Sequence, residues 1–228
     1  MMYPDQGSAR TQRRQALRRT RPGVTTLVLD MGGVVIPTLF ERVRVPSFPS
    51  GPFQDAARPD AEYVNVESGQ MQERDYWAQL AARHPELDIG ELWRNCSIVR
   101  EEMTDLLHRI GGRVRVTAFT NDMAHWFGPG WPARFPILQS FDTILEASVL
   151  GGRKPVSAAF RAAVDALGED PRRCLFVDDL AANLDGARAA GMAAELFDVT
   201  DPAGSVARVV KALGLPADEP RRRRVWAP

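Results

Sequence analysis

The clearest pattern in the chain is a series of short apolar runs, rich in β-branched residues, that each end in polar residues. The runs cover residues 24–29, 113–119 and 174–177. Continuous runs of this kind are typical of strands that are buried on both faces, as in a parallel sheet. Helical spacing follows in 156–167 and in 181–192, with Gly168 ending the first of these. Strands that alternate with helices predict a doubly wound, Rossmann-like α/β core with a parallel sheet.

The stretch 38–110, between the first and second predicted strands, has a different character. It opens with a proline-rich loop and then places apolar residues at i, i+3 and i+4 spacing in 75–82 and 91–107, which predicts helices. A stretch of this length exceeds an ordinary connection between elements. We therefore expect 38–110 to be a helical cap inserted after the first strand, and the core to consist of 23–37 and 111–215.

The zero net charge of the 228 residues is unevenly distributed. Residues 1–22 hold six arginines and one acid, and 221–224 are four arginines, which leaves 19 basic and 28 acidic residues in 23–220, a net charge of −9. We interpret 1–22 and 216–228 as basic, disordered tails. A nucleic-acid arm or an organelle presequence is the alternative for the first tail. The acidic body itself indicates no nucleic-acid partner.

Composition excludes several other classes of protein. No apolar run approaches the roughly 18–20 residues that cross a bilayer, and 44% hydrophobic with 25% charged residues indicates a folded core. Cys96 and Cys174 are too few for a disulfide framework or a cysteine-rich zinc site, and both are expected to be small buried hydrophobes. We expect a cytoplasmic protein, either a monomer or a homodimer, with no membrane partner.

Polar residues follow every predicted strand. In a doubly wound sheet, ligands bind outside the carboxyl ends of the strands, so these residues are expected to share one crevice. With a lysine-containing segment added, the three strand ends give four motifs, which are Asp30-Met-Gly-Gly33, Phe119-Thr-Asn121, Gly152-Arg-Lys154-Pro, and Phe176-Val-Asp-Asp179 followed by Asn183. Together they match the needs of phosphoryl transfer, which are a nucleophile, neutralisation of charge and exact placement.

The first two motifs supply a nucleophile and phosphate contacts. Asp30 is the candidate nucleophile, because carboxylates form aspartyl-phosphate intermediates. Gly32 and Gly33 let the backbone turn its N–H groups towards an anion. Thr120 offers a hydroxyl and Asn121 an amide to phosphate oxygens.

The last two motifs supply charge. Lys154 is one of only two lysines beside 27 arginines, and a compact ammonium suits binding of both a phosphate and a nucleophilic carboxylate. Asp178 and Asp179 are candidates for the acidic side of a Mg²⁺ site, because hard cations take oxygen ligands. Each residue alone is also compatible with an ordinary helix cap, turn or solvated side chain. The hypothesis therefore depends on their joint occurrence at strand ends.

Four motifs in this order resemble the haloacid dehalogenase-like (HAD) hydrolase superfamily, over about residues 24–200. The resemblance implies a Mg²⁺-dependent phosphomonoesterase that acts on a small phosphorylated metabolite through an aspartyl-phosphate on Asp30.

The resemblance also implies how the metal is held. Asp179 would be a direct ligand, together with the Asp30 carboxylate and the backbone oxygen of Gly32. Asp178 and Asn183 would mainly support that arrangement.

One position departs from the family pattern. HAD phosphatases usually carry a second aspartate two residues after the nucleophile, as general acid and base, and this chain has Gly32 there. General acid–base catalysis contributes roughly 10²–10⁴-fold in rate. Three interpretations stay open: a leaving group that needs little protonation, such as an anomeric sugar; another proton donor, with His125 as the candidate; or loss of activity, leaving a binding or regulatory protein.

Within the superfamily, the chain most resembles the subgroup that contains bacterial α-D-glucose-1-phosphate phosphatase. That subgroup shares the D-x-G motif and a histidine- and tryptophan-containing stretch after the second motif, here 123–131. Dehalogenases also lack the second aspartate, but they need no Mg²⁺ and lack the Asp-Asp pair. In the cap, Trp77 and Trp93 are expected to be core residues, with a stacking platform as the alternative.

Overall fold

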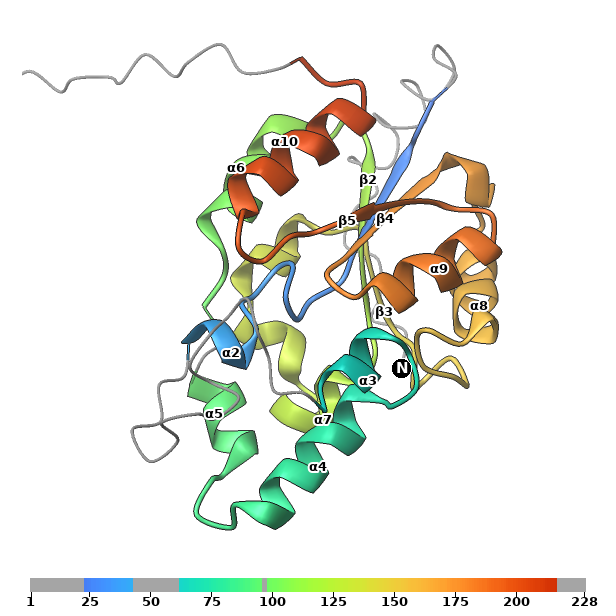
Figure 1. The fold of residues 1–228 in the computed structure, drawn as a ribbon. Coiled ribbons are helices and arrows are strands. Elements are labelled where there is room, and N and C mark those ends of the chain that lie inside the picture. The colour runs from blue at the N-terminus through green and yellow to red at the C-terminus, as the bar shows by residue number, and fades with distance from the viewer. Residues whose placement is uncertain (1–22, 43–61, 96–97, 217–228) are drawn as a thin grey trace, which may run out of the picture.

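The computed structural model describes residues 23–42, 62–95 and 98–216, and places a five-stranded parallel sheet at the centre (Figure 1). The strand order is β3-β2-β1-β4-β5, which confirms the doubly wound α/β fold. The strands are β1 (Thr26–Leu29), β2 (Arg115–Thr120), β3 (Thr143–Glu146), β4 (Cys174–Asp178) and β5 (Ala193–Leu196). The predicted tails, apart from Pro216, lie outside the described residues, as do the proline-rich loop and Cys96.

Two of the five strands were not predicted from the sequence. Both β3 and β5 have four residues, and they form the two edges of the sheet. No residue of β5 is fully buried, and only two residues of β3 are. Short edge strands have no continuous apolar run, so the pattern that reveals a central strand is missing.

Alternation along the central strand divides the core into two layers. Leu27 and Leu29 belong to one hydrophobic cluster with α6 (Glu101–Ile110) and α10 (Pro202–Ala212). Val28 belongs to the other, with α8 (Ser157–Leu167) and α9 (Ala181–Ala189). Successive side chains of a strand point to opposite faces, so these helix pairs cover opposite faces of the sheet (Figure 1).

A group of shorter helices lies beyond the carboxyl ends of the strands (Figure 1). They are α2 (Leu39–Arg42), α3 (Val64–Glu67), α4 (Glu73–Arg83), α5 (Ile89–Asn95) and α7 (Met123–Phe127). Rings of Phe40, Tyr63, Tyr76 and Trp77 lie with their centroids 4.7–6.4 Å apart and join α2, α3 and α4. Three short 3-10 helices, η1 (Trp131–Arg134), η2 (Pro136–Ser140) and η3 (Pro171–Arg173), complete the elements.

The helical pattern expected over 91–107 proves to be two helices, α5 and α6. Arg100 separates them with an extended backbone conformation, and its N–H donates to the carbonyl of Val35 at 3.0 Å. Unlike α5, helix α6 packs against α10. Helix α6 therefore belongs to one of the two helical layers that cover the sheet, although the sequence pattern placed it in the 38–110 cap.

The side chain of Arg100 holds the loop that follows β1. Its Nη2 donates to the Gly33 carbonyl at 3.0 Å and to Glu41 Oε1 at 2.6 Å, and the guanidinium is only 6% exposed. Glu41 also accepts from the backbone N–H of Thr38 at 2.7 Å. This buried ion pair fixes both ends of the turn that leads from the sheet to α2.

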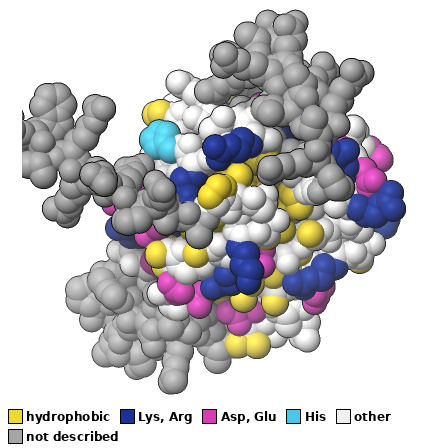
Figure 2. Space-filling view, turned by 90° about the horizontal axis from the view of Figure 1, so that it is seen from above, with side chains coloured by type: hydrophobic (Ala, Val, Ile, Leu, Met, Phe, Trp, Pro, Cys, Tyr) yellow, Lys and Arg dark blue, Asp and Glu magenta, His cyan; other side chains and the backbone are white. Residues whose placement is uncertain are grey.

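The surface opposite α4 carries both signs of charge. Figure 2 shows basic and acidic side chains interspersed on the described part of this face. Within the described residues, no helix is both long and apolar enough to span a bilayer.

Replacing Arg100 tests the importance of the buried ion pair. We expect Arg100→Ala to lower the free energy of unfolding by about 3–5 kcal/mol, because Glu41 is then left buried without its partner. Urea unfolding followed by circular dichroism measures the change. The control is Arg172→Ala, whose side chain is 83% exposed in its pair with Asp170, and which should leave the free energy of unfolding almost unchanged. Equal losses in the two variants would contradict the assignment.

Candidate active site

The candidate site lies where the sheet changes direction. From β1 the chain builds β2 and β3 on one side, then returns to place β4 and β5 on the other. Asp30 follows β1 and donates its backbone N–H to the Val177 carbonyl of β4 at 3.0 Å. Ligands of doubly wound sheets bind at this switch point. The structure therefore brings the ends of β1 and β4 together as expected.

Lys154 is the only lysine here, and it is 1% exposed. Its Nζ lies 2.9 Å from Asp30 Oδ1 and 2.7 Å from Asp178 Oδ2. Burial disfavours the charged ammonium, but the carboxylates of Asp178 and Asp30 outweigh it and raise the pKa of Lys154 above its ordinary value. The lysine stays charged and joins the loop before α8 to both strand ends.

Asp178 is fully buried, and donors surround its carboxylate. Besides Lys154, Asn183 Nδ2 donates to the two oxygens at 2.9 and 3.1 Å, and the Leu180 N–H donates to Oδ1 at 2.9 Å. Asp179, by contrast, lines a pocket at the strand ends. This geometry agrees with the supporting role that the resemblance implies for Asp178 and Asn183.

The two oxygens of Asp30 have different surroundings. Oδ1 accepts from the Met31 N–H at 2.6 Å and from Lys154, whereas Oδ2 has no partner among the described residues. Burial raises the pKa of Asp30 to about 8; Lys154 opposes the shift and Asp178 adds to it. One oxygen is anchored and the other is available to react.

Three carboxylates form a cluster that could hold a metal ion. One oxygen each from Asp30, Asp178 and Asp179 lies within 4.8 Å of the others. Burial, then the charges of Asp178 and Asp30, raise the pKa of Asp179 well above its ordinary value. Oxygen ligands suit hard divalent cations, and a cation would relieve the crowding of negative charge.

The backbone leaves room for this cluster at Gly33. Its φ is +72°, and a Cβ built there would overlap the Asp179 carboxylate. Only glycine satisfies both conditions. The residues present therefore fit a divalent metal.

Asn121 has a positioning task in addition to the phosphate contact that we expected. Its Oδ1 accepts from the Lys154 backbone N–H at 2.7 Å, and its Nδ2 lies 3.4 Å from the Lys154 carbonyl. Gln72, before α4, donates to the same carbonyl at 3.3 Å. Thr120, at the end of β2, is 4% exposed and lines the pocket beside it.

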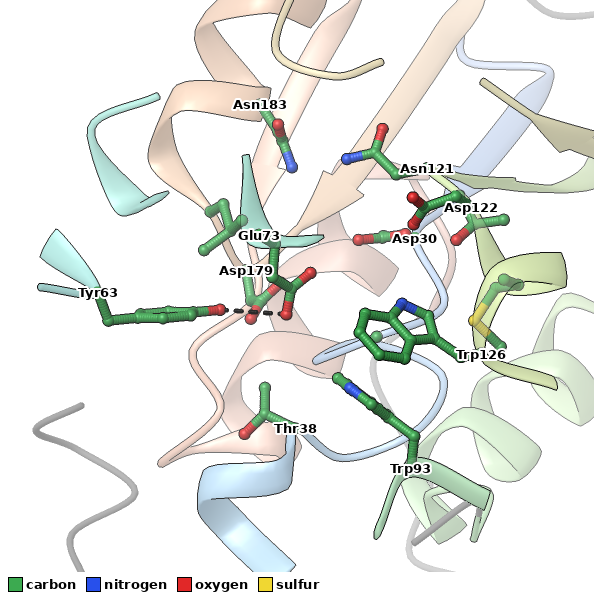
Figure 3. A pocket seen from close by; sticks show the side chains of 14 residues that line it. Asp30, Thr38, Tyr63, Glu73, Trp93, Asn121, Asp122, Trp126, Asp179 and Asn183 are labelled. Atoms are coloured by element: carbon green, nitrogen blue, oxygen red, sulfur yellow. Dashed lines mark hydrogen bonds between the residues drawn. The ribbon is translucent and has the colours of Figure 1, made fainter. Parts of the chain in front are cut away.

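One pocket collects most of the predicted residues (Figure 3). Those that line it are Asp30, Gly32, Thr120, Asn121, Asp179 and Asn183. Lys154 and Asp178 lie directly behind, joined to Asp30 through the ammonium.

The side chains that close the pocket from the helical side were not predicted from the sequence. Tyr63, Glu73 and Trp126 line it, and Trp93 lines it while remaining 5% exposed (Figure 3). For Trp93, a core position was expected from the sequence, and a stacking position that faces the substrate was the alternative.

Glu73 is the most informative of these residues. Its Oε1 accepts from Trp77 Nε1 at 3.1 Å and from the Tyr63 hydroxyl at 3.4 Å. Burial raises its pKa; the hydrogen bond from Trp77 opposes the shift, and the charge of Asp122 adds to it. The sequence did contain a signal for this residue. Glu73 lies three and four residues before the buried Tyr76 and Trp77, and therefore on the same face of α4.

His125, the candidate substitute acid, does not line this pocket in the structure, and its geometry does not support that role. The imidazole is exposed and packs on the ring of Trp126 with centroids 4.6 Å apart. It lines an outer groove beside Leu87 and Ile89 instead. Neighbouring residues of a helix point about 100° apart, so Trp126 faces inward and His125 outward.

The fold is of the α/β class, and an aspartate follows its first strand directly. The family model for haloacid dehalogenase-like hydrolases matches residues 24–191. The chain belongs to this family.

One curated relative matches part of the chain. Phosphatase MT3486 of Mycobacterium tuberculosis (strain CDC 1551 / Oshkosh) is 44% identical over 57 residues, which are 25% of this chain and 26% of that protein. The match thus spans about a quarter of the relative's length.

Solved structures share the fold at low identity. A predicted HAD-like family hydrolase from Porphyromonas gingivalis is 19% identical with a TM-score of 0.53, over 83% of this chain and 99% of that one. A HAD-superfamily hydrolase, subfamily IA, from Geobacter sulfurreducens is 19% identical with a TM-score of 0.52, over 78% and 89%. A HAD family enzyme from Bacteroides thetaiotaomicron, in complex with magnesium and inorganic phosphate, is 18% identical with a TM-score of 0.50, over 78% and 96%.

Alanine substitutions at the two neighbouring glycines should differ in their effect on divalent-cation binding. Gly33→Ala should abolish divalent-cation binding, because its Cβ overlaps the Asp179 carboxylate, and the positive φ should cost roughly 1–2 kcal/mol of stability. Gly32→Ala should retain binding, since its Cβ would meet only Trp93 Cη2 at 3.9 Å. Calorimetric titration with Mg²⁺ and urea unfolding measure both effects. If Gly33→Ala binds Mg²⁺ with wild-type affinity, the metal site does not depend on the room that Gly33 leaves for the Asp179 carboxylate.

The affinity for a divalent cation should depend on pH. Because the pKa of Asp30 is raised to about 8, the carboxyl is protonated below that pH, and cation binding must displace the proton. Affinity for Mg²⁺ should therefore rise roughly tenfold per pH unit between pH 6 and 8 for one displaced proton, then level off. Isothermal titration calorimetry at pH 6, 7, 8 and 9 tests this. An affinity that stays constant from pH 6 to 8 would contradict it.

Proposed function

We propose that this chain is a Mg²⁺-dependent phosphomonoesterase that hydrolyses a small phosphorylated metabolite through an aspartyl-phosphate on Asp30. The observation that carries the proposal is the environment of Asp30. Its Oδ1 is held by Lys154 and by the Met31 N–H, and its unpartnered Oδ2 belongs to a residue that lines the pocket. An anchored carboxylate with one available oxygen is suited to nucleophilic attack.

In the first step, Asp30 Oδ2 attacks phosphorus, and the bond to the leaving-group oxygen breaks with its electron pair on that oxygen. The Thr120 hydroxyl, which lines the pocket, would donate to a phosphate oxygen, and the buried Lys154 ammonium would offset the phosphate charge from behind Asp30. Asp30 and Asp179 would hold Mg²⁺, with the backbone oxygen of Gly32, and Asp178 would support them. When bound, the metal supplies neutralisation of phosphate charge.

In the second step, water attacks the phosphorus of the aspartyl-phosphate and releases inorganic phosphate, which restores Asp30. The family's usual acid and base for the two steps would stand at position 32, where this chain has no side chain. Substrates whose leaving group is only weakly basic should therefore react fastest.

The pocket favours a neutral, hydroxylated leaving group. Beyond the strand ends it presents Tyr63, Glu73 and Asp122. Two arginines beside it, Arg74 and Arg153, lie 3.9 and 3.3 Å from Asp122 Oδ2, so their charge is already met by that carboxylate. A sugar phosphate with an anomeric leaving group, the substrate type of the D-x-G subgroup, meets both requirements.

Further support comes from the relatives. The protein from Mycobacterium tuberculosis is named a phosphatase, and the structure from Bacteroides thetaiotaomicron contains magnesium with inorganic phosphate. We also propose that α3, α4 and α5 act as a cap that selects the substrate, and that the protein works in the cytoplasm as a monomer or homodimer.

The second candidate is a catalytically impaired HAD-like protein that binds a phosphorylated ligand. Gly32 favours it, because the general acid and base is missing. The intact arrangement of Asp30, Lys154, Asp178 and Asp179 favours the enzyme.

Variants of the two reactive carboxylates test the proposal. Asp30→Asn and Asp179→Ala should each lower kcat for Mg²⁺-dependent hydrolysis of p-nitrophenyl phosphate by about 10³-fold or more, because one removes the nucleophile and the other a metal ligand. The control is Asp185→Asn, an aspartate that is exposed on α9 and paired with Arg188, which should keep wild-type activity.

Near-wild-type rates in Asp30→Asn would eliminate the aspartyl-phosphate. If the wild-type protein binds Mg²⁺ but hydrolyses none of a panel of phosphorylated metabolites and aryl phosphates, the binding protein is the correct assignment.

A further inference from the structure

We propose that the indole N–H of Trp93 donates a hydrogen bond to the leaving-group oxygen of the substrate and so replaces, in part, the acid that position 32 lacks. The inference rests on the proposed phosphatase function and identifies a contact that acts on the leaving group rather than on the phosphate.

Trp93 carries an unpartnered polar group into the pocket. The residue is 5% exposed, and its Nε1 is buried without a hydrogen-bond partner among the described residues. It lines the same pocket as Asp30 and Asp179, and Figure 3 shows the indole at the side of this space formed by α5. A buried N–H without a partner is rare in folded proteins and is costly to keep. A ligand in the pocket would provide the missing acceptor.

The ring also occupies the right place relative to the nucleophile loop. A Cβ built on Gly32 would have Trp93 Cη2, at 3.9 Å, as its nearest neighbour. The indole therefore fills the space beside the position from which an acidic side chain would extend. Edge contact with Trp77, at a centroid distance of 6.0 Å, and tilted contact with Trp126, at 6.1 Å, fix its orientation.

The chemistry differs from that of an acid. When the bond from phosphorus to the leaving oxygen breaks, negative charge develops on that oxygen, and the hydrogen bond from the indole strengthens. The proton remains on Nε1, because an indole is a very weak acid, and water supplies the proton that completes the alcohol. The contact is thus worth most when the leaving oxygen is strongly basic.

Glu73 is the competing source of help for the leaving group. It lines the same pocket, and a protonated carboxyl could transfer a proton outright. A carboxyl that donates its proton would show a descending limb in the pH–rate profile, which Glu73→Gln would remove. A hydrogen bond from Trp93 has no titrating group and leaves the profile unchanged.

The test compares Trp93→Phe with the wild-type protein on two substrates in Mg²⁺, ethyl phosphate and p-nitrophenyl phosphate. Phenylalanine keeps an aromatic ring and removes the N–H. We expect kcat/KM for ethyl phosphate to fall about 10²-fold, and that for p-nitrophenyl phosphate to fall less than about 3-fold, because the aryl oxygen needs little stabilisation. The slope of log kcat/KM against leaving-group pKa should steepen, while the pH profile keeps its shape.

A matched control is Trp131→Phe. Trp131 is also fully buried, but it lies outside the pocket and donates to Glu146 at 3.2 Å. Trp131→Phe should change kcat/KM for both substrates by the same factor, because it perturbs the structure without touching the leaving group.

Equal losses on both substrates in Trp93→Phe, or no loss on either, would overturn the inference while leaving the phosphatase function in place. A steeper slope in Glu73→Gln but not in Trp93→Phe would assign the role to the carboxyl instead. A wild-type protein that hydrolyses neither substrate would reject the proposed function, and this contact with it.

Discussion

The buried ammonium of Lys154 is the interaction on which the site depends. It neutralises two carboxylates that the parallel sheet forces together, because Asp30 and Asp178 end neighbouring strands. Without it, two acids would share a dry space with no compensating charge, and the pKa of Asp30, already raised by burial, would rise further. The desolvation of the ammonium is offset by its two short contacts, and Asn121 fixes the loop that delivers it. One charge therefore sets both the geometry of the strand ends and the protonation of the nucleophile.

The other half of the site depends on packing rather than charge. Arg100 and Glu41 hold the turn after β1 through buried hydrogen bonds. The aromatic cluster of α2, α3 and α4 fixes the positions of these short helices relative to one another. Glu73 stands on α4, which belongs to this cluster, and Trp93 on α5 contacts the cluster through Trp77. The phosphate-binding end of the site is thus held by buried ion pairs. The leaving-group end is formed by side chains of the short helices, which can change without disturbing those ion pairs.

This division explains what the sequence predicts. Strand-end residues are predictable because parallel strands must bring their carboxyl ends to one edge, so Asp30, Thr120 and Asp179 could be placed together. The edge strands β3 and β5 could not, since they lack a fully buried run. The capping residues depend on rotations of short helices, which one sequence pattern does not specify. The place of His125 was unpredictable for the same reason, because sequence distance from Asn121 does not tell which face of α7 meets the pocket.

The scarcity of lysine gives the molecule an unusual chemical surface. Of its two lysine side chains, Lys154 is sealed between aspartates and remains charged, so it is neither accessible nor nucleophilic. Lys211, exposed on α10, is left as the single side-chain amine open to acylating reagents. Such a reagent would place one label on the side chains of this protein, in the last turn of α10 and outside the residues that line the pocket, and would report on the molecule without entering that pocket.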